Sequence, residues 1–166
     1  MRTKDLTHLN SAGRVHMIDV SEKIDTERRA SAEGRLFASP EVLHTVLTGT
    51  AVKGDVLAVA RIAAIMAAKR TAEWIPLCHP ISLSGIDVAI ELEADAIRVV
   101  TEVATTAATG VEMEALTGVN AALLTLYDML KSVDRGMHLG GIRLLSKSGG
   151  RSGSYRAPGD GLRGEE

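Results

Sequence analysis

The stretch from Val111 to Lys131 constrains the fold most, because its pattern favours one long helix that is buried on two sides. Apolar residues recur every three or four positions, as in a buried helix stripe: Leu116, Val119, Leu123, Leu126, Leu130 and Val133. The opposite face carries small residues, namely Gly118, Ala121, Ala122 and Thr125. A solvated face would carry Lys and Glu, whereas small residues suit the close approach of another backbone. We therefore predict that a second element packs there.

Two carboxylates lie near the ends of this helix, and the distance between them matters. Glu114 and Asp128 fall within about 40° of each other around the axis, but they are separated by roughly 21 Å along it. One small substrate can hardly touch both residues on the same helix. Either only one end is functional, or a second copy of the chain brings its own end alongside.

Composition narrows the class of protein. The chain has 166 residues, enough for one domain with a real core. Its 19 basic and 21 acidic residues give no electrostatic case for a nucleic-acid or membrane partner, and aromatic residues that could stack on bases make up only 2%. A single cysteine, Cys78, fits a reducing cytoplasm, and neither a secretory segment nor an apolar span is visible. We expect a soluble cytoplasmic protein.

The order of the expected elements indicates an α+β fold. After a short strand over 15–20, the patterns predict a strand over 28–37, helices over 40–49 and 56–68, strands over 86–92 and 97–105, the long helix, and a strand over 138–147. Ser39 and Asp55 are the expected N-caps of the first two helices. From residue 28 this order is the ferredoxin-like βαββαβ pattern, with helices on one face of an antiparallel sheet.

The same patterns lead to three expectations about domain organisation and burial. We expect a single domain over 15–156, with a flexible N-terminus at 1–14 and a flexible tail at 157–166. The second face of the sheet has alternating apolar positions available, which suggests that another subunit covers it. The nearly apolar helix over 56–68 should be buried on several sides.

Cys78 and His79 lie on a loop that Pro76 and Pro80 stiffen. A small buried cysteine beside a hydrogen-bonded histidine explains this pair without any chemistry, and on residue types alone that interpretation is favoured. No CxxC or HxxxH partner accompanies the pair, which argues against zinc. Adjacent residues of an extended segment point opposite ways, which argues against a Cys–His nucleophile.

Basic residues at three places in the chain could bind an anion. Lys53 precedes a helix N-terminus, Lys131 is three positions from Asp128, and the segment 147–153 combines two cations with flexible glycines. Each also has an ordinary explanation: an exposed loop lysine, a surface ion pair and a solvated tail. Paired tightly, Asp128 and Lys131 could shift each other's pKa and act as an acid–base couple.

Several segments of the chain resemble the MoaC family. They are Met17–Lys23, Lys53–Val56, Ala67–Thr71, Ile75–Pro80, Thr109–Leu116, Leu126–Lys131 and Lys147–Gly150. They cover about residues 15–155 in one register and in the family's order. This is the family of cyclic pyranopterin monophosphate synthases of molybdenum cofactor biosynthesis.

The resemblance implies a lyase that converts (8S)-3′,8-cyclo-7,8-dihydroguanosine 5′-triphosphate to cyclic pyranopterin monophosphate and releases pyrophosphate. It also implies a ferredoxin-like fold and a homo-hexamer, a trimer of dimers with its sites between subunits. No cofactor or protein-bound metal is implied, although Mg²⁺ can accompany the triphosphate. A site between subunits would bring Glu114 and Asp128 of different chains to one substrate.

The resemblance also implies roles for individual residues. The residues implied in catalysis are Asp128, as the acid–base residue, and the two lysines Lys53 and Lys131. The implied substrate contacts are Leu77, Cys78, His79, Met113 and Glu114, together with Glu112, Lys69, Arg28 and Lys147. One departure concerns position 151, where the family usually has Lys and this chain has Arg. Arginine keeps the charge but does not exchange a proton at neutral pH.

Two other functions remain as alternatives. An RNA-binding βαββαβ module would need exposed aromatic residues on the sheet and a basic surface, and the composition provides neither. A catalytically inactive paralogue, acting as a structural or regulatory subunit, is the second alternative. The presence of Lys53, Asp128 and Lys131 argues against it.

Overall fold

The computed structural model describes residues 12–158, so most of the two predicted flexible ends lies outside the described residues. Its elements are β1 (Thr26–Phe37), α1 (Pro40–Leu47), α2 (Val56–Ala68), α3 (Thr71–Trp74), β2 (Gly85–Leu92), β3 (Ala96–Ala107), α4 (Glu112–Leu130), β4 (His138–Ser148) and β5 (Tyr155–Arg156). Each predicted helix, and each strand predicted from residue 28 onward, is present within a few residues of its expected ends. The predicted α+β fold is confirmed.

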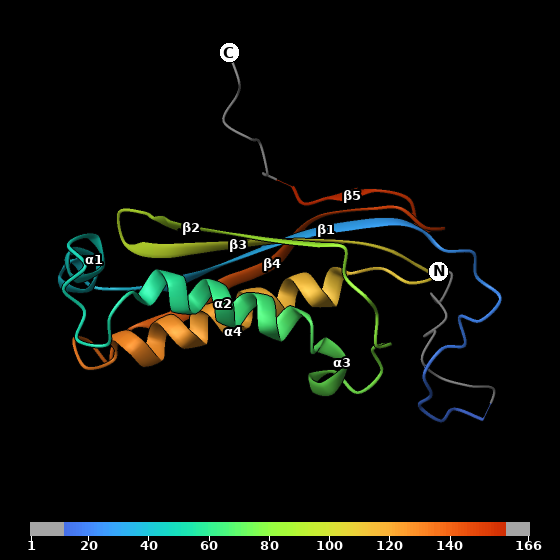
Figure 1. Cartoon of the computed structure of the whole chain (residues 1–166), viewed down its shortest axis with the longest axis horizontal. Coiled ribbons are helices and arrows are strands. Elements are labelled where there is room, and N and C mark those ends of the chain that lie inside the picture. Colours follow the sequence, from blue (N-terminus) through green and yellow to red (C-terminus); the bar gives the residue numbers. More distant parts are fainter. Residues whose placement is uncertain (1–11, 159–166) are drawn as a thin grey trace, which may run out of the picture.

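The sheet has the strand order expected for a ferredoxin-like pattern, β2-β3-β1-β4, with β5 added at the β4 edge. All four pairings are antiparallel. Figure 1 shows the sheet along one side of the molecule and helices α2 and α4 running along its other side. Between residues 12 and 158, no helix is long and apolar enough to cross a membrane.

Helix α4 packs against the sheet through its predicted apolar stripe. Val119, Leu123, Leu126 and Leu130 are fully buried. Gly34 lets β1 approach the helix closely, because a Cβ at that position would lie 2.8 Å from Leu123 Cδ1. The core therefore lies between this stripe and the inner faces of β1 and β3.

The small-residue face of α4 packs against α2, as predicted. A Cβ at Gly118 would lie 3.4 Å from the backbone oxygen of Ala64 and 2.9 Å from Cγ2 of Thr101. The prediction that α2 is buried on several sides is only partly right. Val59, Ile62 and Met66 are 44%, 58% and 49% exposed and form an apolar stripe directed away from α4 and the sheet.

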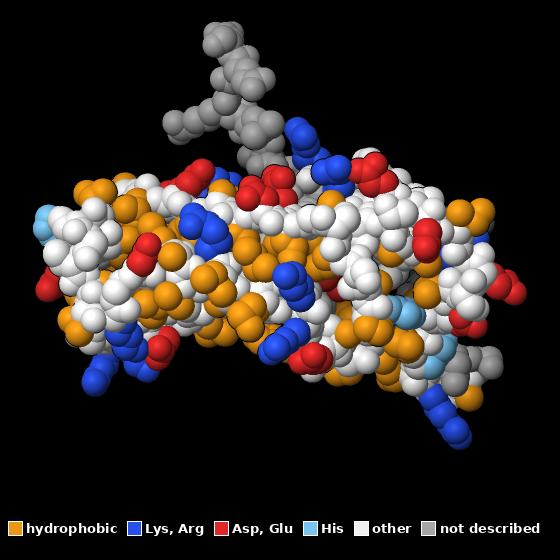
Figure 2. All heavy atoms as spheres, viewed as in Figure 1, with side chains coloured by type: hydrophobic (Ala, Val, Ile, Leu, Met, Phe, Trp, Pro, Cys, Tyr) orange, Lys and Arg blue, Asp and Glu red, His pale blue; other side chains and the backbone are white. Residues whose placement is uncertain are grey.

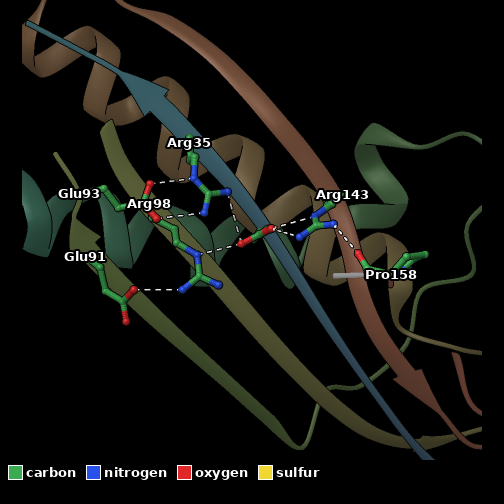
Figure 3. A network of polar contacts seen from close by, with 7 residues as sticks. Arg35, Glu91, Glu93, Arg98, Arg143 and Pro158 are labelled. Atoms are coloured by element: carbon green, nitrogen blue, oxygen red, sulfur yellow. Dashed lines mark hydrogen bonds and ion pairs between the residues drawn. The ribbon is translucent and has the colours of Figure 1, made fainter. Parts of the chain in front are cut away.

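The open face of the sheet is charged, so the expectation of an apolar second face is wrong. The apolar positions of the strands face the helices. Alternation along a strand shows which residues share a face, but it does not show which of the two faces is covered. On the open face, Glu33 is 2% exposed and accepts 2.8 Å hydrogen bonds from Arg98 and Arg143. Figure 3 shows how the network continues through Arg35, Glu91 and Glu93.

Three local features differ from the sequence-based expectations. Residues 15–20 form no strand beyond an isolated bridge at Val15, and the carbonyl of Ile18 bonds to His79 instead of a neighbouring strand. The short helix α3 precedes the proline-stiffened connector. Strand β5 follows the glycine-rich turn, and Ala157 beyond it is buried, donating a 2.7 Å hydrogen bond to Leu145.

Candidate active site

Lys53, Asp128 and Lys131 form one cluster at the C-terminal end of α4. The Lys53 ammonium donates to the Asp128 carbonyl oxygen at 2.8 Å and to its carboxylate at 3.0 Å. The Lys131 ammonium donates to the other carboxylate oxygen at 2.6 Å. Lys53 is therefore not an isolated loop lysine. It joins the predicted Asp128–Lys131 pair to form a cluster of three residues.

The folding of α2 explains how Lys53 reaches Asp128. Gly54 turns the chain with φ +87°, a conformation that glycine adopts without strain. The Asp55 carboxylate then caps α2 by accepting a 3.0 Å hydrogen bond from the Ala58 N–H. Because α2 runs antiparallel to α4, the residues just before α2 lie beside the end of α4 (Figure 1).

The cluster has a surplus positive charge. Hydrogen bonds from Lys131, and then from Lys53, lower the pKa of Asp128, so its carboxylate stays ionised at neutral pH. Two ammonium groups around one carboxylate leave a net charge of +1. All three side chains are partly exposed, which leaves them accessible to a substrate. The cluster can bind an anion and pass a proton between an ammonium and a carboxylate.

The other end of α4 holds a second group of predicted residues. Leu77, Cys78, His79, Glu112, Met113 and Glu114 line one hollow. The proline-stiffened connector supplies the first three, and the first turn of α4 supplies the rest. The N-terminal segment closes this hollow with Ile18, Val20 and Lys23.

Glu114 is the buried carboxyl group of this hollow. It is only 4% exposed, and burial raises its pKa to about 7, with a smaller contribution from Glu112. Burial, followed by the charge of Glu114, also raises the pKa of the Cys78 thiol. Glu114 can therefore hold or release a proton near neutral pH, whereas Cys78 is kept as a thiol.

His79 and Glu114 also line a second hollow, on the side of α2. Lys69 lies there together with Arg70, Thr71 and Glu73. Lys69 follows the last turn of α2 as its C-cap, and α3 begins immediately after Arg70. This arrangement places two consecutive basic residues beside the His79–Glu114 pair.

Lys147 and Arg28 lie at the same end of the molecule as Glu114. Lys147 lines a hollow with Glu112, and its ammonium contacts the Ser152 hydroxyl. Arg28 donates to the carbonyl oxygens of Ala107 and Ala108, at 3.4 and 3.5 Å, just before α4 begins.

The glycine turn after β4 packs on Arg28. Gly149 and Gly150 have φ values of +91° and +74°, and a side chain at Gly150 would overlap the Arg28 guanidinium. These glycines are therefore required both for the backbone conformation and for the close approach. Arg151, at the position where the resemblance leads one to expect Lys, is exposed on the same turn.

The structure thus divides the predicted residues into two groups. The three predicted catalytic residues meet at one end of α4, and the nine predicted substrate contacts lie around its other end or at the adjoining ends of β1 and β4. The rise of an α-helix puts Glu114 and Asp128 roughly 21 Å apart within one chain. Two further basic residues line these hollows, Lys23 and Arg70, and both belong to segments that carry the family resemblance. The spacing around them does not indicate a site.

Comparison with known proteins gives a consistent result. A family model described as the MoaC family matches residues 17–150. The cyclic pyranopterin monophosphate synthase of Methylobacterium sp. (strain 4-46) is 57% identical over 154 residues, which cover 92% of this chain and 96% of that protein. The protein of the same name from Thermomicrobium roseum is 54% identical over 158 residues, covering 94% and 95% of the two chains.

Proposed function

This chain belongs to the MoaC family, and from that premise we propose that it catalyses the reaction for which its relatives are named, as an enzyme of molybdenum cofactor biosynthesis. The reaction converts (8S)-3′,8-cyclo-7,8-dihydroguanosine 5′-triphosphate to cyclic pyranopterin monophosphate, with release of pyrophosphate. The observation that carries the proposal is the Lys53–Asp128–Lys131 cluster, because it brings the three residues implied in catalysis together as a group that can bind an anion and exchange a proton.

The complete site, in this proposal, is built from two copies of the chain. The cluster at Asp128 and the hollow at Glu114 both contain groups suited to the reaction, but they lie at opposite ends of one helix. A two-fold axis perpendicular to α4, passing beside its middle, would place the Asp128 end of one copy beside the Glu114 end of the other. Each pair of chains would then contain two complete sites.

The exposed surface of the helical layer supports this pairing. Val59, Ile62 and Met66 on α2, and Leu124 on α4, are exposed apolar residues between the two ends. Figure 2 shows hydrophobic side chains gathered where α2 runs in Figure 1, with basic side chains among them. An apolar patch of this kind is typical of protein–protein contacts. Three such pairs would give the hexamer that the family resemblance implies.

The chemistry of the two ends is complementary. Loss of pyrophosphate from a triphosphate develops negative charge, and Lys53, Lys131 and Lys147 can neutralise it. Rearrangement of the guanine-derived ring requires proton transfers. Asp128 with its lysines can supply these at one end, and Glu114, with a pKa of about 7, can supply them at the other.

Two further parts of the proposal concern metal binding and the cellular compartment of the enzyme. Among residues 12–158, no group of three or more His, Cys, Asp or Glu side chains is placed to hold a metal ion. We propose that any Mg²⁺ enters the site with the triphosphate, as a part of the substrate. We place the enzyme in the cytoplasm, where a single free cysteine is stable as a thiol.

Turnover by the purified chain tests the function. Incubation with the cyclic dihydroguanosine triphosphate should release pyrophosphate and form cyclic pyranopterin monophosphate in equal amounts, without any second protein. A chain that is folded, binds the triphosphate and forms no product would contradict the enzymatic function and favour the inactive-subunit alternative. The Glu41→Gln variant, which changes an exposed residue in the first turn of α1, is a control that should remain active.

A further inference from the structure

Tyr127 lies in the last turn of α4, between the core and the cluster formed by Lys53, Asp128 and Lys131. Asp128 is its neighbour in sequence, and Lys131 follows four positions later, which places the Tyr127 and Lys131 side chains on the same face of the helix. The Tyr127 side chain is half-buried and packs against the hydrophobic core. The proposed function gives this residue no role.

The Tyr127 hydroxyl connects α4 to the chain that returns from its end. It donates a 3.2 Å hydrogen bond to the carbonyl oxygen of Arg135, eight positions further on. The loop between them begins with a tight turn, in which the Val133 N–H donates to the Leu130 carbonyl oxygen at 2.8 Å. The hydroxyl thus ties the far end of the loop 132–136 to the helix.

Tyr127 also contacts the near end of this loop, through its backbone. Lys131 is the C-cap of α4, and its N–H donates to the Tyr127 carbonyl oxygen at 2.9 Å. Helix ends fray when the residues beyond them are not held. With one contact at Lys131 and another at Arg135, Tyr127 holds both ends of the loop that begins beside the cluster.

The position of the Lys131 ammonium depends on such restraint. A helical side chain leans towards the N-terminus of its helix, so Lys131 extends over Asp128 and Tyr127. Its ammonium lies 2.6 Å from the Asp128 carboxylate, although the two side chains are 50% and 58% exposed. An exposed pair of this kind is ordinarily weak, because a long lysine loses rotamer freedom when it is held in one place. The pair therefore needs a well-ordered C-cap.

We propose that Tyr127 is a positioning residue for the cluster. Its hydroxyl keeps the loop 132–136 folded against α4, so that the C-cap does not fray and Lys131 stays on the Asp128 carboxylate. Lys53 reaches the same carboxylate from the segment before α2 and does not depend on this loop. The inference rests on the proposed function for the identity of the reaction, whereas the restraint on Lys131 is a property of the chain alone.

Nitrogen NMR of the lysine ammonium groups in the full chain tests this restraint. Lys131→Gln and Lys53→Gln assign the two signals by their loss. In the unmodified chain both ammonium groups should be restrained by Asp128. In Tyr127→Phe the Lys131 ammonium should become more mobile, whereas Lys53, the internal reference, should stay as it was. An unchanged Lys131 signal would overturn the proposal, and so would an equal loosening of both lysines, which would indicate a general effect on the fold.

Steady-state kinetics test the consequence for the reaction. Tyr127→Phe keeps the aromatic ring and every charge of the cluster, so KM should stay within about twofold, while kcat should fall about tenfold because the proton-transfer geometry is less well held. Ser132→Ala removes an exposed hydroxyl from the same loop and is the matched control, with kcat unchanged. An unchanged kcat in folded Tyr127→Phe would overturn the positioning role.

The two measurements also separate this inference from the proposed function. Absence of turnover in the unmodified chain would be a failure of the proposed function. The ammonium signals of Lys131 and Lys53 would still decide whether Tyr127 positions the cluster, because they require no substrate.

Discussion

Glu114 and Asp128 occupy the first and last turns of the same helix, and the structure gives them opposite surroundings. Glu114 is buried, with a raised pKa, whereas Asp128 is exposed between two lysines that lower its pKa. Roughly 21 Å of helix separates them. Two carboxyl groups with pKa values displaced in opposite directions are suited to different steps of one acid–base reaction, provided that both reach the same substrate.

Removal of the Asp128 charge should abolish most activity without unfolding the chain. We expect Asp128→Asn to lower kcat by about 100-fold or more, because the variant loses the acid–base group and the charge that holds Lys53 and Lys131. Since the side chain is exposed, the melting temperature should change little. Kinetics and thermal unfolding of the same preparation check this. A variant with normal kcat would exclude Asp128 from catalysis.

Stability should depend on pH through Glu114. Burial raises its pKa to about 7 from the ordinary 4.5, so between those pH values the folded chain holds a proton that the unfolded chain has released. The free energy of unfolding should therefore fall as the pH rises from 4.5 to about 7. In Glu114→Gln this contribution to the slope should disappear. Denaturant titrations of both chains across that range measure the difference, and parallel pH profiles would refute it.

The Glu33 network should contribute to stability. Burial by itself would raise the pKa of Glu33, but hydrogen bonds from Arg98 and Arg143 outweigh this effect and hold the pKa below its usual value. Replacement by Gln would leave three arginine side chains crowded around a neutral group. We expect Glu33→Gln to lower the free energy of unfolding by on the order of 3 kcal/mol. Glu27→Gln, at an exposed pair on the same strand, is the matched control and should have almost no effect.

The contact between α2, α4 and the sheet should not tolerate a larger residue at Gly118. A Cβ there would approach Thr101 to 2.9 Å, so Gly118→Val should destabilise the chain by about 1–3 kcal/mol through overpacking. The Thr101 hydroxyl is buried without a hydrogen-bond partner within the described part of the chain. Thr101→Val should therefore be neutral or stabilising. Chemical denaturation of both variants tests whether this contact is as tight as the structure shows.

Regular elements were predictable because their periodicity reflects burial directly. The long helix and the β2–β3 hairpin appear almost where their apolar patterns begin and end. The segment around Ile18 was predicted as a strand because apolar residues are spaced in the same way in any extended chain. Its carbonyl bonds to a side chain 61 positions away, and no local pattern indicates such a contact.

Faces and long-range contacts were harder to predict than elements. The Asp128–Lys131 pair follows from helical spacing, but Lys53 joins it only because α2 and α4 are antiparallel. Alternation in β1 did not show that the face with Glu33 and Arg35 would be open and charged. For α2, an apolar sequence indicated burial, whereas Ile62 and Met66 are exposed in the single chain. Burial against a second copy of the chain would account for that difference.

A subunit-mixing assay tests the central claim, that one site is built from two chains. Asp128→Ala and Glu114→Ala, each inactive alone, are mixed, dissociated mildly and reassembled, and pyrophosphate release is measured. If each site takes its two ends from different chains, random reassembly should restore about a quarter of the unmodified activity. If reassembled mixtures contain both chains and show no activity, the two residues act within one chain. A site between copies would then be excluded.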